Sequence, residues 1–292
     1  MSLEQRAQIE LIHIELIEKF GPHRLIPSHH TNQRNDTWLL HSEQGVVGVV
    51  KWCRWLSNKT MTGVIEAERR ARAAGVPVPE VLYRSISRPL VVYAYVDGEH
   101  RIPDSIALTD ACAESFVRQL DGLRGFLPTW TPARPSSLPR RAHEAIANSP
   151  DQRLGRAVSE SWHRLAELAA DQPVAASHAD WRADNILFLD REVAAVLDWE
   201  DVVMLPAAEA AGYAAGSLTH SWRETLQRPL ALPAVMRFLE VTGELLAWQP
   251  GSPEMAHARL AAYFTCAVRL AEEQHRGGAA VTYGELQTAL GG

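Results

Sequence analysis

One stretch constrains the fold of this chain more than any other. Residues 178–199 read HADWRADNILFLDREVAAVLDW, and within them two short apolar runs, Ile186–Leu189 and Val193–Leu197, enclose the polar segment Asp190–Glu192. Two apolar runs joined by a short polar turn are typical of a tight hairpin of buried strands. The sequence therefore predicts a β-hairpin here.

Three polar residues accompany this predicted hairpin. Asn185 lies at its entry, Asp198 at its exit, and Asp180 on the loop just before it. A hairpin brings its two ends together. The side-chain oxygen atoms of these three residues would therefore converge on one point, as a hard cation such as Mg²⁺ requires. Phosphoryl transfer uses such a set, with one Asp orienting the attacking hydroxyl while an Asn and a second Asp hold the metal. The alternative is that these residues only form turns, which is common beside hairpins.

The same residues carry a family resemblance. His178-Ala179-Asp180, then Asn185, then Leu197-Asp198-Trp199-Glu200 resemble the catalytic core of the aminoglycoside phosphotransferases, which share the protein-kinase-like fold with the choline kinases. The resemblance implies that Asp180 is the catalytic aspartate, that Asn185 and Asp198 are Mg²⁺ ligands, and that His178 supports the loop. The chain departs from the family pattern at Ala179, where glycine is usual, and at Glu209, where an aspartate usually braces the catalytic loop.

The resemblance also implies the architecture. We expect an α+β chain with a bilobal protein-kinase-like fold. Residues 1–96 would form an antiparallel-sheet N-lobe that binds nucleotide, and residues 97–292 a mainly helical C-lobe that carries the catalytic loop and the substrate site. ATP would lie between the lobes.

Lys51 is the second anchor of this interpretation. It ends the apolar segment Val46–Val50, which with Trp38–Leu40 predicts another hairpin, and the chain contains only two other lysines. A buried unpaired ammonium group is costly. By the resemblance, Lys51 would hold the α- and β-phosphates and pair with a glutamate of the next helix, predicted over Thr62–Ala74. The alternative is an edge-strand lysine whose amine reaches water.

Two glutamates of that helix are candidates for the partner of Lys51. Counting back from Pro77 favours Glu66, and Glu68 remains open. The resemblance also makes the strand Leu90–Val96 the hinge, where backbone groups of Ala94 and Val96 would hold the adenine. The loop Ser28–Asn35 would cover the phosphates, although it contains no glycine.

Composition limits the class of protein. The net charge of −6 over 292 residues argues against a nucleic-acid binder, which would carry a basic face. Three scattered cysteines suggest neither a disulfide framework nor a metal knuckle. We see no signal peptide and no apolar run of the roughly 18 residues that a membrane span needs. The expected location is the cytoplasm.

These observations predict an ATP- and Mg²⁺-dependent kinase that phosphorylates a hydroxyl of a small molecule, an aminoglycoside-like antibiotic or a metabolite. A catalytically inactive nucleotide-binding module is the alternative, favoured by the glycine-free loop, Ala179 and Glu209. A metal hydrolase using His178 and Asp180 lacks further ligands at suitable spacing. The sequence identifies neither the acceptor, nor the choice between ATP and GTP, nor the oligomeric state.

Overall fold

A computed structural model describes residues 3–28, 35–128, 130, 137–149, 151–178, 180–221, 228–277 and 281–291. The chain divides into two compact units. The first comprises residues 1–62 and 79–96, and the second comprises residues 63–78 and 97–292. The proposed lobes divide the chain at the same place, after Val96, but the second unit also includes residues 63–78.

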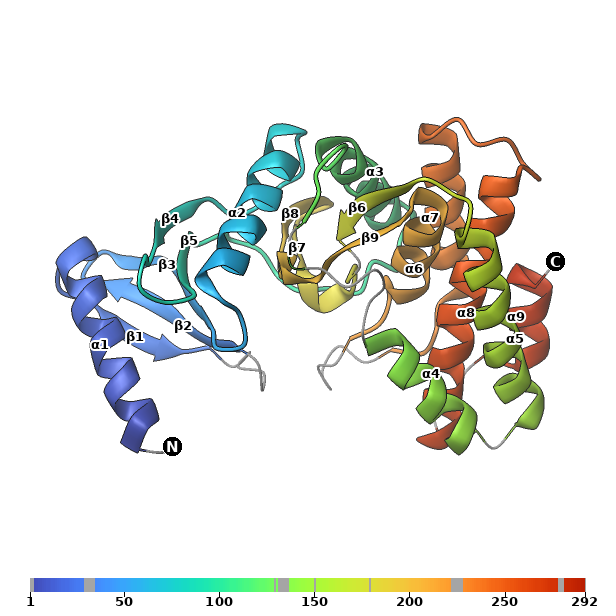
Figure 1. Cartoon of the computed structure of the whole chain (residues 1–292), viewed down its shortest axis with the longest axis horizontal. Helices are drawn as coiled ribbons and strands as arrows, with labels where there is room; N and C mark the ends of the chain where they lie inside the picture. The colour runs from blue at the N-terminus through green and yellow to red at the C-terminus, as the bar shows by residue number, and fades with distance from the viewer. Residues whose placement is uncertain are drawn as a thin grey trace. The chain divides into compact units, whose positions relative to one another are not determined.

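The first unit is an antiparallel sheet with a helix on one face. Its five strands lie in the order β1 (Arg24–Pro27), β2 (Asn35–Ser42), β3 (Gly45–Cys53), β5 (Leu90–Ala94) and β4 (Val81–Arg84) (Figure 1). The helix α1 (Leu3–Phe20) packs Ile12 and Leu16 against apolar residues of β2, β3 and β5. The helix is followed by Gly21, which has a φ of 72°.

The position of Lys51 follows from this sheet. In β3 it pairs with Thr37 of β2 on one side and with Val91 of β5 on the other. The strand is therefore interior, and the side chain of Lys51 is buried. The alternative of an edge-strand lysine is wrong.

The helix α2 (Asn58–Ala73) begins four residues before the predicted start at Thr62. Ser57 explains the difference, because its Oγ accepts a hydrogen bond from the Thr60 N–H at 3.1 Å. A serine that accepts from the first turn is a standard helix N-cap.

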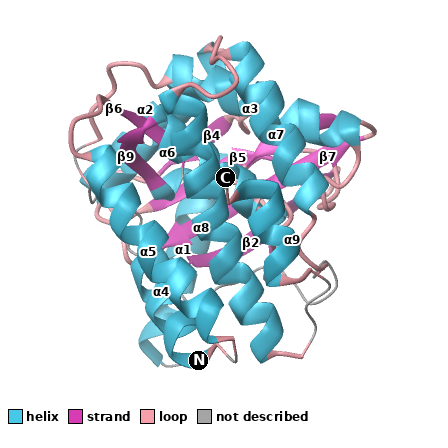
Figure 2. Ribbon diagram, turned by 90° about the vertical axis from the view of Figure 1, so that its right-hand side faces the viewer, coloured by secondary structure: helices cyan, strands magenta, loops and turns pink. Residues whose placement is uncertain are grey.

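The second unit is mainly helical (Figure 2). Besides residues 63–73 of α2, it contains the helices α3 (Ile106–Gly122), α4 (Ser137–Asn148), α5 (Gln152–Ala169), α6 (Ala207–Ser217), α7 (Leu232–Leu245), α8 (Pro253–His275) and α9 (Tyr283–Leu290). Among the described residues, none of the helices has the length and apolar character of a membrane span.

Helices α6 and α8 form the centre of this unit. Nine of the eleven residues of α6 are buried, and most of them are alanine or glycine. A Cβ atom on Gly212 would lie 2.3 Å from the carbonyl oxygen of Ala258, so the two helices approach too closely for a larger residue.

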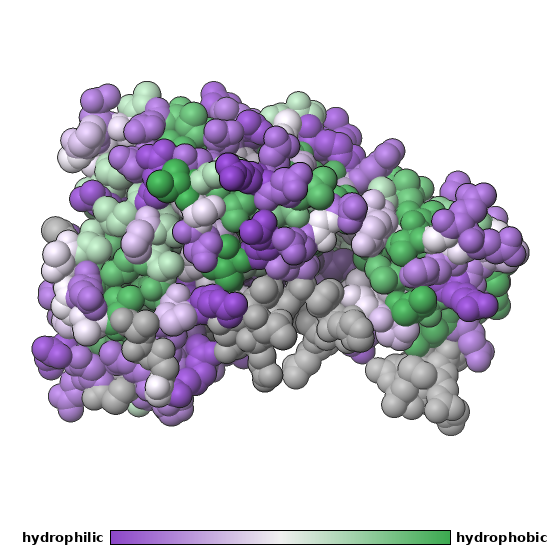
Figure 3. All heavy atoms as spheres, turned by 180° about the vertical axis from the view of Figure 1, so that it is seen from behind, coloured by the Kyte–Doolittle hydropathy of each residue, from purple (hydrophilic) through white to green (hydrophobic). Residues whose placement is uncertain are grey.

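Some apolar side chains are exposed at the surface, for example Leu11 and Ile14 of α1. Figure 3 shows apolar patches scattered among polar ones.

Two small antiparallel sheets complete the second unit. The predicted hairpin is confirmed as β7 (Ile186–Leu189) paired with β8 (Glu192–Val196), joined at Asp190, which has a φ of 55°. The other sheet pairs β6 (Val174–His178) with β9 (Val202–Pro206). His178 ends β6, Asp180 follows it, Asn185 directly precedes β7, and Asp198 comes two residues after the end of β8.

Candidate active site

His178 connects two segments of the site. Its Nδ1 lies 3.1 Å from the backbone N–H of Asp180, so this nitrogen accepts, and Nε2 must then donate to the Leu197 carbonyl at 2.8 Å. The ring is therefore neutral, with its proton on Nε2. Burial is the main cause that lowers the pKa of His178 and so favours this neutral form.

The strand β6 that ends at His178 is held by a residue that we did not predict. Gln119 of α3 is fully buried, donates from its Nε2 to the Ser177 Oγ at 3.2 Å, and accepts the His178 N–H at 3.0 Å. The sequence contains a signal for it. Gln119 follows Cys112 and Phe116 on the apolar face of α3, and a polar side chain on such a face must find hydrogen-bond partners.

Asp180 and Asn185 are brought together as predicted. The Asn185 Nδ2 donates to both the backbone oxygen and the Oδ2 of Asp180, at 2.9 Å each. This arrangement directs the amide nitrogen to Asp180 and leaves the amide oxygen, the atom that a hard cation would coordinate, outside these two bonds.

Asp180 has a second partner, Arg182, which the sequence analysis did not single out. The Arg182 guanidinium donates from Nε and Nη2 to the two carboxylate oxygens of Asp180. Its Nη1 lies 3.9 Å from the Oδ2 of Asp184. A basic residue two positions after a predicted catalytic aspartate was the available signal.

Asp198 lies at the end of the hairpin in a left-handed backbone conformation, with φ 62° and ψ 50°. The preceding residue, Leu197, donates its N–H to the Asn185 carbonyl at 2.8 Å, so the two ends of the hairpin are adjacent as predicted. A non-glycine residue at positive φ is uncommon and is often found at functional sites.

Asn185 and Asp198 carry oxygen atoms of the kind that Mg²⁺ prefers as ligands. The described residues contain no group of three or more His, Cys, Asp or Glu side chains arranged to hold a metal. Mg²⁺ is usually held by one or two carboxylates together with substrate phosphates, so Asp198 and the Asn185 oxygen are a sufficient protein contribution.

The two candidate glutamates of α2 differ in their surroundings. Glu66 is 35% exposed and binds Arg69 at 2.7 Å and Arg70 at 2.9 Å. These hydrogen bonds, that of Arg69 first, lower the pKa of Glu66 to about 2. Glu68 is buried. The expected choice of Glu66 as the partner of Lys51 stays a prediction. Both carboxylate oxygens of Glu66 already accept hydrogen bonds from arginines of α2.

The remaining expectations fall on other parts of the chain. Ala94 lies in β5 with its N–H bonded to the Glu80 carbonyl at 2.7 Å, and Val96 follows that strand. Glu209 is fully buried, where its Oε1 accepts the Tyr213 hydroxyl at 2.7 Å and its Oε2 lies 3.7 Å from the His257 Nε2. Ala179 and residues 29–34 of the glycine-free loop lie outside the described residues.

A family model described as the phosphotransferase enzyme family matches residues 28–269. This chain belongs to that family.

Solved structures support the same fold. The aminoglycoside 2'-phosphotransferase-IIIa, as a GDP complex of a mutant, matches with 14% identity and a TM-score of 0.56, with 91% of each chain covered. The choline kinase LicA from Streptococcus pneumoniae matches with 13% identity and a TM-score of 0.57, over 97% of this chain and 98% of its own.

A third similar structure is a thermostable mutant of the aminoglycoside phosphotransferase APH(4)-Ia in a ternary complex with ADP and hygromycin B. It has 16% identity and a TM-score of 0.56, with 95% of this chain and 97% of its own covered. No curated protein matches the sequence. The predicted family and the α+β protein-kinase-like fold of this phosphotransferase are therefore confirmed, while identities this low carry no information about its substrate.

Proposed function

We propose that this phosphotransferase uses ATP and Mg²⁺ to phosphorylate a hydroxyl group of a small molecule. The observation that carries the proposal is the convergence of Asp180 and Asn185, joined by direct hydrogen bonds, at the base of the hairpin that ends in Asp198. Similar structures have been solved with ADP or with GDP, which supports a nucleotide as the phosphate donor.

Asp180 would orient the acceptor hydroxyl and take up its proton as the oxygen attacks the γ-phosphate. For this role one carboxylate oxygen must turn to the substrate, while the other keeps its bond to Asn185 or Arg182. Because His178 holds the Asp180 backbone through a single tautomer, the loop is positioned before the substrate binds. Such positioning, together with electrostatic stabilisation, supplies most of the catalysis in phosphoryl transfer.

Asn185 and Asp198 would hold Mg²⁺ through the amide oxygen and the carboxylate. The bound ion neutralises charge on the phosphate oxygens. The left-handed backbone of Asp198 sets the direction of its Cα–Cβ bond. Arg182, which lies against Asp180, would add positive charge close to the transferred group.

Lys51 would bind the α- and β-phosphates, and the backbone of Ala94 and Val96 would bind the adenine. The Ala94 N–H is bonded to Glu80, so its carbonyl oxygen would make the contact. For the glutamate that pairs with Lys51 we propose Glu68 in place of Glu66. Glu68 is buried like Lys51, whereas arginines of its own helix neutralise Glu66.

Nucleotide binding tests the proposal first. A ligand that binds the native state raises the melting temperature. At a ligand concentration of 100 times its Kd, the free energy of unfolding increases by about 2.7 kcal/mol. We expect Mg²⁺-ATP to raise it more than ATP alone, and Asp198→Asn to lose the Mg²⁺-dependent part. Asp190→Asn is a matched control, because Asp190 lies on the same hairpin and also has a positive φ.

Turnover tests it second. ADP formation with a phosphorylated acceptor as product would identify a kinase, and Asp180→Asn should lower kcat by a factor on the order of 10²–10⁴ while Mg²⁺-ATP still binds. If Mg²⁺-ATP raises the melting temperature but no turnover that requires Asp180 is found, the result would favour the inactive nucleotide-binding module. If neither ATP nor GTP changes the melting temperature, the proposal is wrong.

A further inference from the structure

The strand β6 leads into the catalytic loop and has one open edge. In the part of the chain that the structure describes, β6 pairs only with β9, and its last residue, His178, lies opposite Val202. The edge of a sheet leaves backbone N–H and C=O groups without strand partners. Since His178 is fully buried, these groups need partners from another element.

The side-chain amide of Gln119 provides such partners for His178. Its Oε1 accepts the His178 N–H at 3.0 Å, and its Nε2 donates to the Ser177 Oγ at 3.2 Å. The Ser177 Oγ in turn donates to the His178 carbonyl at 3.3 Å. A primary amide carries the donor and the acceptor of a peptide group, so Gln119 and Ser177 together satisfy the backbone of His178 as a neighbouring strand would.

Gln119 is supported in turn by the packing of α3. It is fully buried, and Phe116, about one turn earlier, packs against Phe238 of α7 with ring centroids 5.6 Å apart. Near the start of α3, Asp110 accepts from the Arg237 Nε at 2.7 Å and from its Nη2 at 2.9 Å. These contacts hold α3 against α7, so the amide of Gln119 has a rigid support.

The backbone of His178 determines where its ring lies. The ring accepts the Asp180 N–H through Nδ1 at 3.1 Å and donates to the Leu197 carbonyl through Nε2 at 2.8 Å. Both bonds require the ring to stay between these two segments. A chain of hydrogen bonds therefore leads from Gln119 through His178 to the residue that would orient the acceptor hydroxyl.

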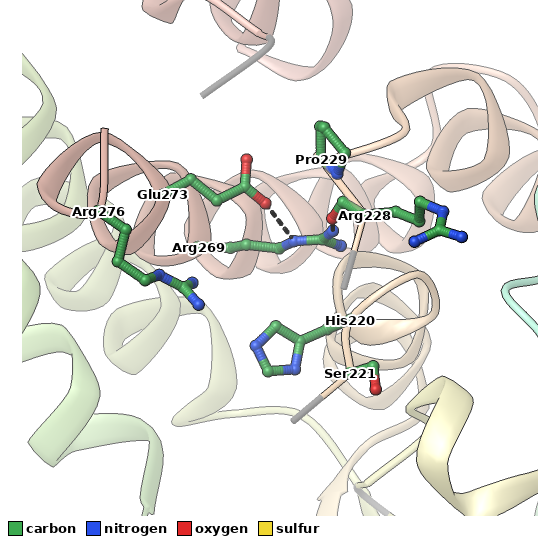
Figure 4. A pocket seen from close by; sticks show the side chains of 7 residues that line it. All are labelled: His220, Ser221, Arg228, Pro229, Arg269, Glu273 and Arg276. Carbon is green, nitrogen blue, oxygen red and sulfur yellow. Dashed lines mark hydrogen bonds and ion pairs between the residues drawn. The ribbon is translucent and has the colours of Figure 1, made fainter. Parts of the chain in front are cut away.

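The catalytic loop has a separate anchor on its far side. The Ala183 N–H donates to the His220 carbonyl at 3.1 Å, and Thr219, the residue before His220, accepts from the buried Arg269 at 2.7 Å. Figure 4 shows Arg269 and His220 in the wall of one small pocket. This anchor does not involve α3, so a change at Gln119 should act on the first part of the loop alone.

We propose that Gln119 is a positioning residue for phosphoryl transfer. Its amide fixes the backbone of His178, and the His178 ring then fixes Asp180 before the substrate binds. The inference rests on the proposed kinase function and adds to it a residue of a distant helix. Phosphoryl transfer depends mainly on positioning, and a displacement of about 1 Å can lower a rate by about 10²-fold.

The alternative is that Gln119 serves only the stability of β6. Removing one partner of a buried hydrogen bond leaves the other partner unsatisfied and destabilises the fold in either case. The free energy of unfolding therefore does not separate the two roles. The state of the His178 ring and the turnover number do.

Nuclear magnetic resonance of isotope-labelled histidine rings tests the first step. The tautomer of a ring sets the chemical shifts of its two nitrogens, and the His178 signals are assigned by their loss in His178→Gln. We expect the native protein to show the neutral ring with its proton on Nε2. Gln119→Leu should convert this single form into a mixture of tautomers.

Cys112→Ala is the matched control and should keep the native His178 signals. Cys112 is buried in α3 about two turns before Gln119, but it takes no part in these hydrogen bonds. For the case that Gln119→Leu does not fold, Gln119→Glu has the shape of glutamine and keeps an acceptor for the His178 N–H. Its ionised carboxylate lacks the donor to Ser177, so it should shift the His178 signals in the same direction but less. Native signals in every Gln119 variant that folds would overturn the inference.

Turnover tests the second step. ADP release from Mg²⁺-ATP is measured without an added acceptor, so that water takes the place of the acceptor hydroxyl and the products are ADP and phosphate. In Gln119→Leu we expect kcat to fall about tenfold or more with little change in KM for ATP, while Cys112→Ala keeps the native kcat. An unchanged kcat in Gln119→Leu would make Gln119 a purely structural residue and contradict the proposal.

The thermal shift with Mg²⁺-ATP on the same samples separates this failure from that of the kinase function. If the native protein shows the shift and turnover, and Gln119→Leu changes neither the His178 signals nor kcat, only the role of Gln119 is wrong. If the native protein shows no shift, the kinase function is wrong and with it the catalytic role of Gln119. The His178 signals then still decide whether the amide holds the ring.

Discussion

At the residue scale, His178 shows how one side chain orders the catalytic loop. Its two ring nitrogens bind the backbone on either side of the site, at Asp180 and at Leu197, and each bond requires the neutral ring with the proton on Nε2. A second proton would turn Nδ1 into a donor that faces the Asp180 N–H. Protonation of this histidine therefore breaks the arrangement that holds the catalytic aspartate.

This arrangement predicts a pH dependence of stability. Burial lowers the pKa of His178 in the folded state, while in the unfolded chain it is about 6.5. The unfolded state then binds the extra proton first as pH falls, so the contribution of His178 is complete above about pH 6.5 and is lost at lower pH. Between pH 7.5 and 5.5 the free energy of unfolding of the native protein should fall more steeply than that of His178→Gln.

Urea unfolding at several pH values measures this slope. His163→Gln, on the exposed surface of α5, is the matched control, because it removes a histidine outside the catalytic loop. Equal slopes for the native protein and His178→Gln would contradict the assignment.

The sequence predicted which residues meet but not how they are held. Asp180, Asn185 and Asp198 could be placed at the hairpin ends because their spacing and the apolar runs fix that geometry. Gln119 lies 59 positions before His178, so its contact with that residue depends on how α3 packs against β6. Arg182 is close in sequence, yet its rotamer, which decides that it binds Asp180, is set by the surrounding structure.

At the scale of elements, the sequence predicted the hairpin of β7 and β8 and the presence of α2, and the error lies at the start of α2. The start of α2 was placed too late because Ser57 was not recognised as an N-cap. Trp181, in the loop between Asp180 and Arg182, is fully buried, and its ring packs edge-on against Phe116 with centroids 5.6 Å apart. Burial of an aromatic residue in a polar loop depends on tertiary packing, which the local pattern does not contain.

The contact between α6 and α8 makes a prediction about stability. Gly212→Val would push a side chain into the space occupied by the Ala258 carbonyl and the Ala261 Cβ, 2.3 and 2.4 Å from the position of a Cβ atom. Overpacking of this kind typically costs about 1–3 kcal/mol. Chemical denaturation should show that loss. Gly284→Ala in α9, where the added Cβ would only make an ordinary van der Waals contact with the Thr282 Oγ1 at 4.0 Å, should be neutral or slightly stabilising.

Substitutions of two glutamates in α2 would show which of them pairs with Lys51. If Glu68 is its partner, Glu68→Gln should lower kcat/KM for ATP by at least about tenfold, because the lysine would lose the charge that positions it. Glu66→Gln removes only a partly exposed pair with Arg69 and Arg70, worth at most about 1 kcal/mol of stability. Steady-state kinetics of the two variants decides, and the reverse order of effects would restore Glu66.

At the scale of the whole molecule, the fold was predictable because a few motif residues carry a resemblance that extends over most of the chain. The substrate class was not, because it depends on which side chains from distant parts of the sequence meet in the folded chain.

The two units should also differ in local stability. The core of the first unit is built on seven buried side chains between α1 and its sheet, whereas α8 alone buries fourteen residues of the second unit. Since amide protons exchange through local or global opening, and opening costs more where more apolar surface is buried, α6 and α8 should exchange most slowly. Hydrogen exchange followed by mass spectrometry measures this order, with Gly212→Val as a variant that should accelerate α6 and α8 selectively. Exchange in α8 as fast as in β1 and β2 would mean that the stability of the fold does not lie in the packed helices.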